Sequence, residues 1–505
     1  MIRISHLSAT SAIALCLATP VLADITAAEV WEDWKSTSAA FGQTLTAGNE
    51  DNSGGVLTLN DVAVTMEMPG EKIDGMIPNI TLTELGNGTV EIRMSPEFVM
   101  TMMIDPPKDS DGEAVKTTIV IATPGMDTVV SGDAAAPIYD FTAPVIDLNV
   151  TEMIVDGSPV DMETAIGLTD LAGRYAIQGT GDRDHESQIN AATLTINISG
   201  SDPEDGGSTF SLKTAYKAIE TTSAGTAAGM GALGGDPAAA ITPETRVTAM
   251  LRHGGGSTAV AVTDPETGDF KLDATTRSGQ LDVTIADGVI GYDAVGKGLD
   301  ITVSGDQIPV PEVTAAMDEM AFGLTLPILK GEDVKDYGLL LNLSGLTVSD
   351  FLWSMIDPET VLPRDPATLL IELAGKARVL TDLTDTAALE AGASPGEVES
   401  LNVKNLRLAF AGADLTGKGD FTFDNSDTLT FGGFPAPDGK VDLKLTGGNG
   451  LLDKLVQLGV LPQDQAMGAR MMMGLFAKPT GDDTMESQIE VKPDGSISAN
   501  GQRLK

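Results

Sequence analysis

The polar segment 181–188, GDRDHESQ, collects side chains of the kinds that hold divalent cations. Carboxylate oxygens and imidazole nitrogens are suitable ligands, and this segment offers Asp182, Asp184, His185 and Glu186 close together. A run of polar residues in a turn is more often simply hydrated. Two interpretations therefore stand at this point, a solvated turn and a cation site, and the turn is favoured.

A second acidic segment, DPPKDSDGE at 105–113, begins like a calcium-binding loop. Asp109, Asp111 and Glu113 alternate along it, as carboxylate ligands do in such loops. The distal bidentate glutamate at loop position 12 is missing. We expect a solvated turn here, with weak surface binding of calcium as the alternative.

GGGSTA at 254–259 places a candidate nucleophile, Ser257, close after a candidate base, His253. Sequence neighbours on a glycine-rich turn seldom meet the geometry of a catalytic triad. The chain has no HExxH, Walker A, GxSxG or strand-following GxGxxG motif. Carboxylate pairs of the glycosidase type cannot be singled out among 73 acidic residues. We therefore expect no enzymatic activity, no cofactor and no bound metal.

The segment 466–476, AMGARMMMGLF, holds four methionines in eleven residues. On a helix, residues spaced by three or four share a face. The apolar face predicted here consists of Met467, Met471, Met472, Leu475 and Phe476. Soft-metal sites usually add cysteine or histidine to methionine, and neither is near. Thioethers fill irregular gaps in cores, so core packing is favoured, and a face that binds an apolar ligand is the alternative.

Residues 1–23 have the pattern of an export signal. Arg3 supplies the positive charge, an apolar stretch follows at 12–17, and Val21-Leu22-Ala23 fits a signal peptidase. We expect cleavage after Ala23 and a periplasmic location. The only cysteine, Cys16, leaves with the signal, so the mature protein has no disulfide. No integral membrane span is expected after cleavage.

The predicted mature chain carries 30 basic and 73 acidic residues, a net charge of −43. Such a charge opposes binding to nucleic acid and to anionic membrane surfaces. Solubility in a salty medium is the favoured explanation, because counterions screen the repulsion. Calcium binding is the alternative.

Period-two alternation of apolar and polar residues recurs along most of the chain and predicts strands with one buried face. The clearest runs are 62–68, 90–94, 98–104, 194–198, 281–285, 299–303, 406–410 and 441–445. Turn sequences separate them, namely Gly-Asn-Gly at 86–88, Asp-Gly at 111–112 and 287–288, Asn-Gly at 500–501, and Pro-Asp-Gly at 437–439 and 493–495. The fold class predicted is mainly β, an extended curved antiparallel sheet or a flattened barrel.

Helical spacing appears in three places. Residues 25–45 predict an N-terminal amphipathic helix. Thr347 and Asp350 predict a capping box before a short helix at 351–356. Residues 450–477 predict a helical hairpin between strands.

The segment 222–240 is rich in glycine and alanine and divides the chain as a loop or linker. It separates an N-terminal β-rich region, 24–221, from a C-terminal one, 241–505, which holds the hairpin. YDFTAPVIDLNV at 139–150 and YDAVGKGLDITV at 292–303 are loosely alike. Two related halves and coincidence both remain open.

The C-terminal third resembles a known family in the segments 349–375, 412–477 and 481–505. This is the alphaproteobacterial domain-of-unknown-function family 2125, made of exported β-rich proteins, and the resemblance is strongest over roughly 300–505. It implies an envelope location and no established activity, so no catalytic residue is transferred. Family-typical residues are Trp353, Arg364, Asp365 and Arg470, for which structural roles suffice, with Arg364 and Asp365 predicted to pair.

A looser likeness concerns the arrangement of elements alone. Strands joined by tight turns and ending in a helical hairpin are similar to AsmA-like envelope proteins, whose sheets form lipid-handling grooves. This chain lacks the membrane helix those proteins usually retain, which argues against a bridging role.

These patterns lead to one functional hypothesis and two alternatives. The hypothesis is a non-enzymatic envelope protein that binds an apolar or amphiphilic ligand, such as a lipid, in a β-sheet groove. The first alternative is a structural or protein-interaction scaffold with envelope proteins as partners. A hydrolase using acidic residues ranks last.

Overall fold

The structure is a computed structural model that describes residues 24–40, 42–68, 70–106, 113–178, 184–202, 207–226 and 241–505. Several predictions concern residues outside these ranges: the leader at 1–23, the Asp-Gly turn at 111–112, Asp109, Asp182 and the greater part of the loop at 222–240.

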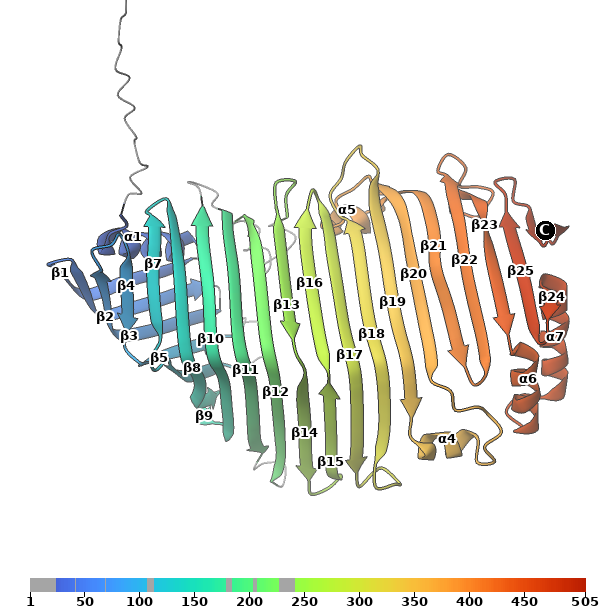
Figure 1. The fold of residues 1–505 in the computed structure, drawn as a ribbon, viewed down its shortest axis with the longest axis horizontal. Coiled ribbons are helices and arrows are strands. Elements are labelled where there is room, and N and C mark those ends of the chain that lie inside the picture. The colour runs from blue at the N-terminus through green and yellow to red at the C-terminus, as the bar shows by residue number, and fades with distance from the viewer. Residues whose placement is uncertain are drawn as a thin grey trace, which may run out of the picture.

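The described chain forms one large antiparallel sheet, which confirms the predicted fold class (Figure 1). Its first strands are β1 (Gln43–Ser53), β2 (Val56–Met68), β3 (Glu71–Glu84), β4 (Val90–Met94), β5 (Glu97–Ile104), β6 (Val115–Ala122), β7 (Asp127–Asp133), β8 (Ala136–Val155), β9 (Ser158–Pro159), β10 (Met162–Gln178), β11 (Asp184–Asp202) and β12 (Ser208–Thr226). Its later strands are β13 (Val247–His253), β14 (Gly256–Asp264), β15 (Gly268–Thr276), β16 (Ser278–Ala286), β17 (Val289–Gly305), β18 (Val313–Pro327), β19 (Lys335–Val348), β20 (Ala367–Val379), β21 (Gly396–Phe410), β22 (Ala413–Asp424), β23 (Ala436–Thr446), β24 (Lys478–Gly481), β25 (Thr484–Val491), β26 (Ile497–Ala499) and β27 (Gln502–Arg503). Every alternating run predicted above falls inside one of these strands.

Strands that are neighbours in the sheet are mostly neighbours in sequence. Long strands such as β10, β11 and β12 pair side by side, and β17 to β23 continue in chain order. Elsewhere two shorter strands lie end to end, as β13 and β14 do beside β12, and β16 and β15 beside β17 (Figure 1). The sheet therefore passes without interruption from β12 to β13, on the two sides of the predicted linker.

A line of kinks, here called the crease, crosses the sheet at right angles to the strands. Where a long strand meets it, one residue takes a left-handed conformation and the ladder skips one pair. The left-handed residues are Asp61, Asp170, Ala218, Gly298 and Gly345, with φ between 49° and 72°. Asp170 in β10 and Ala218 in β12 meet the line at the same point of the strand between them, Ala192.

The crease explains how apolar side chains stay on one face of strands this long. In β17 the apolar residues hold even positions before Gly298, as at Tyr292, and odd positions after it, as at Leu299 and Ile301. The pairing of β17 with β18 keeps one register on both sides of Gly298, so no residue is inserted and the alternation shifts in both strands together. A glycine tolerates the left-handed conformation at little cost.

The helices are α1 (Ala27–Ala40), α4 (Asp350–Ile356), α5 (Thr386–Glu390), α6 (Gly448–Gln457) and α7 (Gln463–Phe476). The predicted N-terminal helix and the helical hairpin are thus confirmed. α1 lies where the first strands curl behind the rest of the sheet, and α6 and α7 lie beyond the other end (Figure 1).

The main core forms between α1 and the curled first strands. Trp31 and Val30 of α1 are buried there against Leu59, Leu82 and Val130, which come from three different strands. The Trp31 indole donates a hydrogen bond of 2.9 Å to Glu50. We call this region, α1 with β1 to β4, β7 and β8, the closed end.

Local predictions around α4 were partly wrong. The helix is present, but its N-cap is Ser349 and no side chain caps it, so the predicted capping box at Thr347 and Asp350 does not form. Arg364 pairs with Asp350 at the start of the helix and not with Asp365. The connection after α4 is fixed instead by the fully buried Asp357, whose carboxylate accepts hydrogen bonds from two backbone amides.

The turn predictions were also partly wrong. Asp287-Gly288 and Asn500-Gly501 form tight turns with both residues at positive φ. Pro437-Asp438-Gly439, by contrast, lies inside β23. A Cβ on Gly439 would lie 2.1 Å from the Asp420 carbonyl oxygen, so this glycine serves a close approach between strands.

Candidate functional site

A row of directly paired residues crosses the sheet on its apolar side. Residues directly opposite each other in paired strands point to the same face. The row runs from the closed end to β25 through Val90, Val130, Tyr139, Tyr175, Ser187, Ser223, Ala249, Val283, Tyr292, Leu324, Leu339, Leu373, Val403, Gly419, Val441 and Ile489. Only two members are polar, and these are neighbours, Ser187 and Ser223.

The adjacent row on the same face is apolar in the same way. From β11 it runs through Ile189, Thr221, Leu251, Leu281, Ala294, Phe322, Leu341, Ile371 and Leu406. One face of the sheet is therefore an apolar strip, here called the trough. It begins in the core of the closed end and continues onto the open sheet, β13 to β25.

On the open sheet the trough is uncovered by the described residues. Leu251, Tyr292, Phe322 and Leu408 each keep more than a third of their surface exposed. The Tyr292 and Phe322 rings contact each other at 6.0 Å. Isolated apolar residues on a surface are ordinary, but a contiguous apolar patch indicates a binding surface.

Towards the closed end the trough deepens into a cavity of about 440 Å³. Its walls come from α1, β4, β7, β8, β10, β11 and β12. The lining residues are Trp34, Ile92, Met94, Met126, Thr128, Tyr139, Phe141, Tyr175, His185, Ser187, Ile189 and Ser223. None of these side chains is a carboxylate, lysine or arginine. A cavity of this size and composition is typical of sites for small apolar molecules.

Contacts among the wall residues fix the shape of this cavity. Phe141 lies across Gly173 of the next strand, where a Cβ would sit 2.3 Å from the ring. Tyr139 donates a hydrogen bond of 2.9 Å to Asp33 of α1. The hydroxyls of Ser187 and Ser223 bond to each other at 2.8 Å. The walls are thus held by contacts among themselves.

His185 lies at the edge of the cavity and is only 6 % exposed. Its ring lies against Tyr175, with centroids 6.2 Å apart and planes 30° apart. Burial lowers the pKa of His185, while a hydrogen bond with the Gly225 backbone and the charge of Asp184 oppose that shift. The imidazole is therefore neutral at pH 7.

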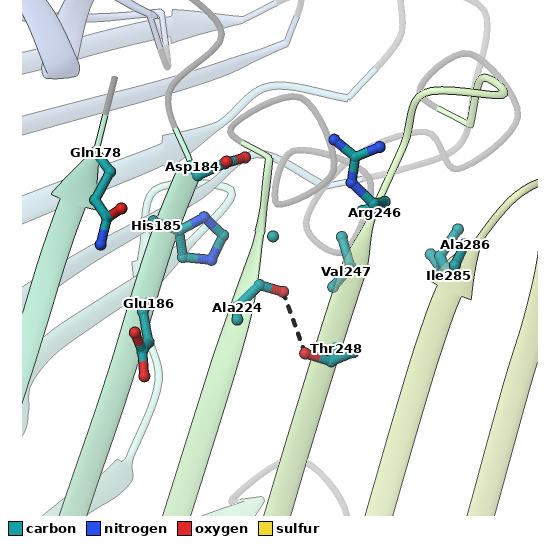
Figure 2. Close-up of a pocket in the computed structure, with 11 residues that line it drawn as sticks. Gln178, Asp184, His185, Glu186, Ala224, Arg246, Val247, Thr248, Ile285 and Ala286 are labelled. Carbon is teal, nitrogen blue, oxygen red and sulfur yellow. Dashed lines mark hydrogen bonds between the residues drawn. The ribbon is translucent and has the colours of Figure 1, made fainter. Parts of the chain in front are cut away.

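A second cavity, of about 390 Å³, continues from His185 towards solvent. In Figure 2 the imidazole projects from β11 towards β12, with Val247 beyond it and Arg246 at the rim. Arg246 supplies a charge here that the first cavity lacks. His185 thus stands between an apolar chamber and an opening that Arg246 lines.

The cation site considered for 181–188 is not assembled by the described residues. Asp184, His185 and Glu186 follow one another in β11, so the imidazole points to one face and the carboxylates to the other. Elsewhere in the described ranges, no group of three histidine, cysteine, aspartate or glutamate side chains could hold a metal ion.

The His253 and Ser257 candidates are also kept apart. His253 meets the Tyr216 ring edge-on at 4.6 Å, and its Nδ1 accepts a hydrogen bond from the Gly255 amide. Ser257 pairs across strands with Ala215, on the face opposite to Tyr216. No nucleophile and base meet here.

The methionine face predicted on 466–476 does lie on one helix, α7, but it is not core. Met467, Met471, Met472 and Leu475 are exposed, between 47 % and 73 %. The core interpretation is therefore wrong for these four, and Phe476 is half-buried. Arg470 ties α7 to α6 through Asp453. Binding of a ligand by this face stays a prediction.

Sequence reasoning singled out His185 as a possible cation ligand and did not predict the cavity. The cavity's residues come from many strands far apart in sequence, and no local motif marks them. The available signal was the pair of aromatic positions, Tyr139 and Tyr175, on strands otherwise filled with aliphatic residues.

Within the described ranges, no helix is both long enough and apolar enough to cross a bilayer. Residues 259–493 match the family described as "Uncharacterized protein conserved in bacteria (DUF2125)". No curated protein matches the chain significantly.

Among solved structures, BauA, the ferric preacinetobactin receptor from Acinetobacter baumannii, aligns over 91 % of this chain and 78 % of its own. The identity is 8 % and the TM-score 0.14, which does not indicate a shared fold. The chain is thus similar, over 259–493, to a bacterial family without an assigned activity.

Proposed function

We propose that this protein is an exported, non-enzymatic envelope protein that binds an amphiphilic or apolar ligand along the trough. The observation that carries the proposal is the continuity of the apolar face. It begins among fully buried residues, deepens into the cavity beside Trp34 and Tyr175, and emerges half-exposed at Phe322. A surface of this shape gains free energy when hydrocarbon replaces water, at about 25 cal/mol per Å².

The charge distribution supports an amphiphile over a polar substrate. The cavity walls carry no ionised side chain, whereas its outer opening does. Hydrogen bonds from neighbouring side chains and backbone amides lower the pKa of Asp264, Asp424, Asp427 and Asp494, which lie at strand ends or in the loops that follow strands. A general acid needs a raised pKa in a cleft, so these groups give no support to a hydrolase.

Export is the part of the proposal that rests on the leader pattern at 1–23. An envelope location also agrees with the likeness to AsmA-like proteins in the order of elements. The expected site of action is the periplasm.

The test is mass spectrometry of an organic extract from the protein purified from periplasm without detergent. A stoichiometric amphiphile is expected, and Phe322→Ser should lower its molar ratio to protein. Phe434→Ser, a change of the same kind at an exposed loop residue, is the matched control. A clean extract from folded, monodisperse protein would contradict the proposal.

One observation favours the alternative of a protein-interaction scaffold. The helix α7, on which Met467 and Met471 are exposed, lies beyond the last strands (Figure 1). Met-rich helical surfaces adapt to varied partners. Loss of an envelope partner in Met471→Glu, with the bound amphiphile retained, would assign this face to a protein.

A further inference from the structure

We propose that His185 anchors the polar head of an uncharged amphiphile through a hydrogen bond between Nε2 of the imidazole and a hydroxyl group of the ligand, while the hydrocarbon chain fills the apolar cavity. This inference rests on the proposed function and names the chemistry of its ligand. A monoacylglycerol or a long-chain alcohol is the class of molecule that fits.

The first support is an unsatisfied atom. Nε2 of His185 is buried and has no hydrogen-bond partner among the described residues. Leaving such an atom unpaired destabilises the folded protein. Native structures seldom keep a buried polar atom without a partner unless a ligand or solvent supplies one.

A hydroxyl group suits this nitrogen in either tautomer of the neutral ring. It donates to a bare Nε2 and accepts from an Nε2 that carries the hydrogen.

The surroundings exclude a charged head group at this point. The apolar cavity on one side has no ionised wall residue, and burial keeps His185 itself neutral. A hydroxyl group is small and uncharged, and it satisfies the atom without needing a counter-charge.

The residue paired with His185 has no side chain, for a structural reason. This cross-strand partner is Gly225, where a Cβ would lie 2.2 Å from the Arg246 carbonyl oxygen. No side chain can therefore be placed at position 225 to bond to the imidazole. The hydroxyl pair Ser187 and Ser223 lies one step further along the strands, with each hydroxyl already bonded to the other.

Position along the trough gives the orientation of the ligand. His185 borders the apolar cavity of about 440 Å³. It also borders the 390 Å³ cavity, whose lining residues, Arg246 among them, are drawn in Figure 2. The chain of an amphiphile fits the first and its hydroxylated head the second. The head group is then reached from solvent at Arg246.

The experiment titrates delipidated full-length protein with three probes that share a twelve-carbon chain: 1-monododecanoylglycerol, methyl dodecanoate and dodecanoate. The monoacylglycerol should bind most tightly. His185→Phe keeps a ring of similar size but removes Nε2, and should weaken monoacylglycerol binding about tenfold, as loss of one buried hydrogen bond does. Binding of the methyl ester should not change. His253→Phe is the matched control.

A second readout reports the hydrogen bond directly. The chain holds three histidines, so ¹⁵N-labelled imidazoles are easily resolved. Monoacylglycerol should move the Nε2 resonance of His185, and the methyl ester should not.

Two outcomes would contradict the role of His185 and leave the proposed function standing. In the first, wild type and His185→Phe each bind the methyl ester as tightly as the monoacylglycerol. In the second, dodecanoate binds most tightly and His185 is protonated in the complex. If no probe binds and the organic extract is also clean, the proposed function fails with it.

Discussion

The closed end and the open sheet are built from the same kind of strand, yet they treat their apolar faces differently. At the closed end the sheet curls and α1 covers it, so Trp31, Leu59 and Val130 are fully buried. On the open sheet the same rows continue with Tyr292 and Phe322 partly in water. Alternation of apolar and polar residues therefore predicts which face of a strand is apolar, but not which element packs on that face. The cavity at His185 lies where the covered closed end gives way to the uncovered open sheet.

The largest change in the free energy of unfolding is expected when a tryptophan is replaced in each of the two regions. Trp31→Ala removes a fully buried indole and its hydrogen bond to Glu50, and should cost about 3–5 kcal/mol. Trp353→Ala on the open sheet removes a half-buried ring stacked on Phe410, and should cost about 1–2 kcal/mol. Denaturant titration measures both. Equal losses of unfolding free energy would show that the closed end is packed no better than the open sheet.

The open sheet, though uncovered, is expected to require a specific backbone conformation at the crease. Gly298→Ala places a Cβ at a residue with φ of +61° and 1.8 Å from Nε of Arg277, whose side chain must move, and should cost about 1–2 kcal/mol. Gly296→Ala lies two residues away, with no atom within 4 Å of the new Cβ, and should be neutral or stabilising by about 0.4–1 kcal/mol. If both variants melt alike, the crease does not constrain the strand.

A pH titration compares the two histidines. Burial lowers the pKa of both His185 and His253, so the unfolded chain binds the proton more readily. Their contribution is fully present above about pH 6.5 and is lost as pH falls below it, by at most about 1.4 kcal/mol per pH unit for each. His185→Gln should remove more of this dependence than His253→Gln, since His185 is the more buried. Parallel stability curves for wild type and His185→Gln would refute this.

The smallest effect is expected from surface ion pairs, which both regions carry. Arg407 meets Asp414 at 3.0 Å on the open sheet, and Arg93 meets Glu91 at 2.9 Å at the closed end. Asp414→Asn and Glu91→Gln should each change stability by less than about 1 kcal/mol, and less in high salt. A large loss at one end only would mean that electrostatics, and not cover, distinguishes the regions.

Much of the fold could be predicted from periodicity, because each strand buries one face. The same reasoning could not find the crease. Asp170 and Ala218 are ordinary residues for a strand's polar face, and their left-handed conformation depends on the neighbouring strands. The likeness of 139–150 to 292–303 has a structural counterpart, since Tyr139 and Tyr292 occupy the same row. Whether the halves are a true repeat stays a prediction.

The candidate site was less predictable. An amphipathic pattern on 466–476 indicated an apolar face, but burial depends on a neighbour, and the described residues leave Met467 and Met471 exposed. His185 drew notice through the acidic residues beside it. Strand alternation turns those carboxylates away, and the imidazole is left among aromatic rings from other strands.

The crease also bears on how such a sheet reaches its register. A ladder slipped by two residues would bring the kinks of adjacent strands out of line, as for Asp170 and Ala218, which now flank Ala192. Most strands pair with a sequence neighbour, so hairpins can add one at a time with little loop closure. Each new hairpin then has to pair in register with the hairpin formed before it, as in repeat proteins whose units contact only their neighbours.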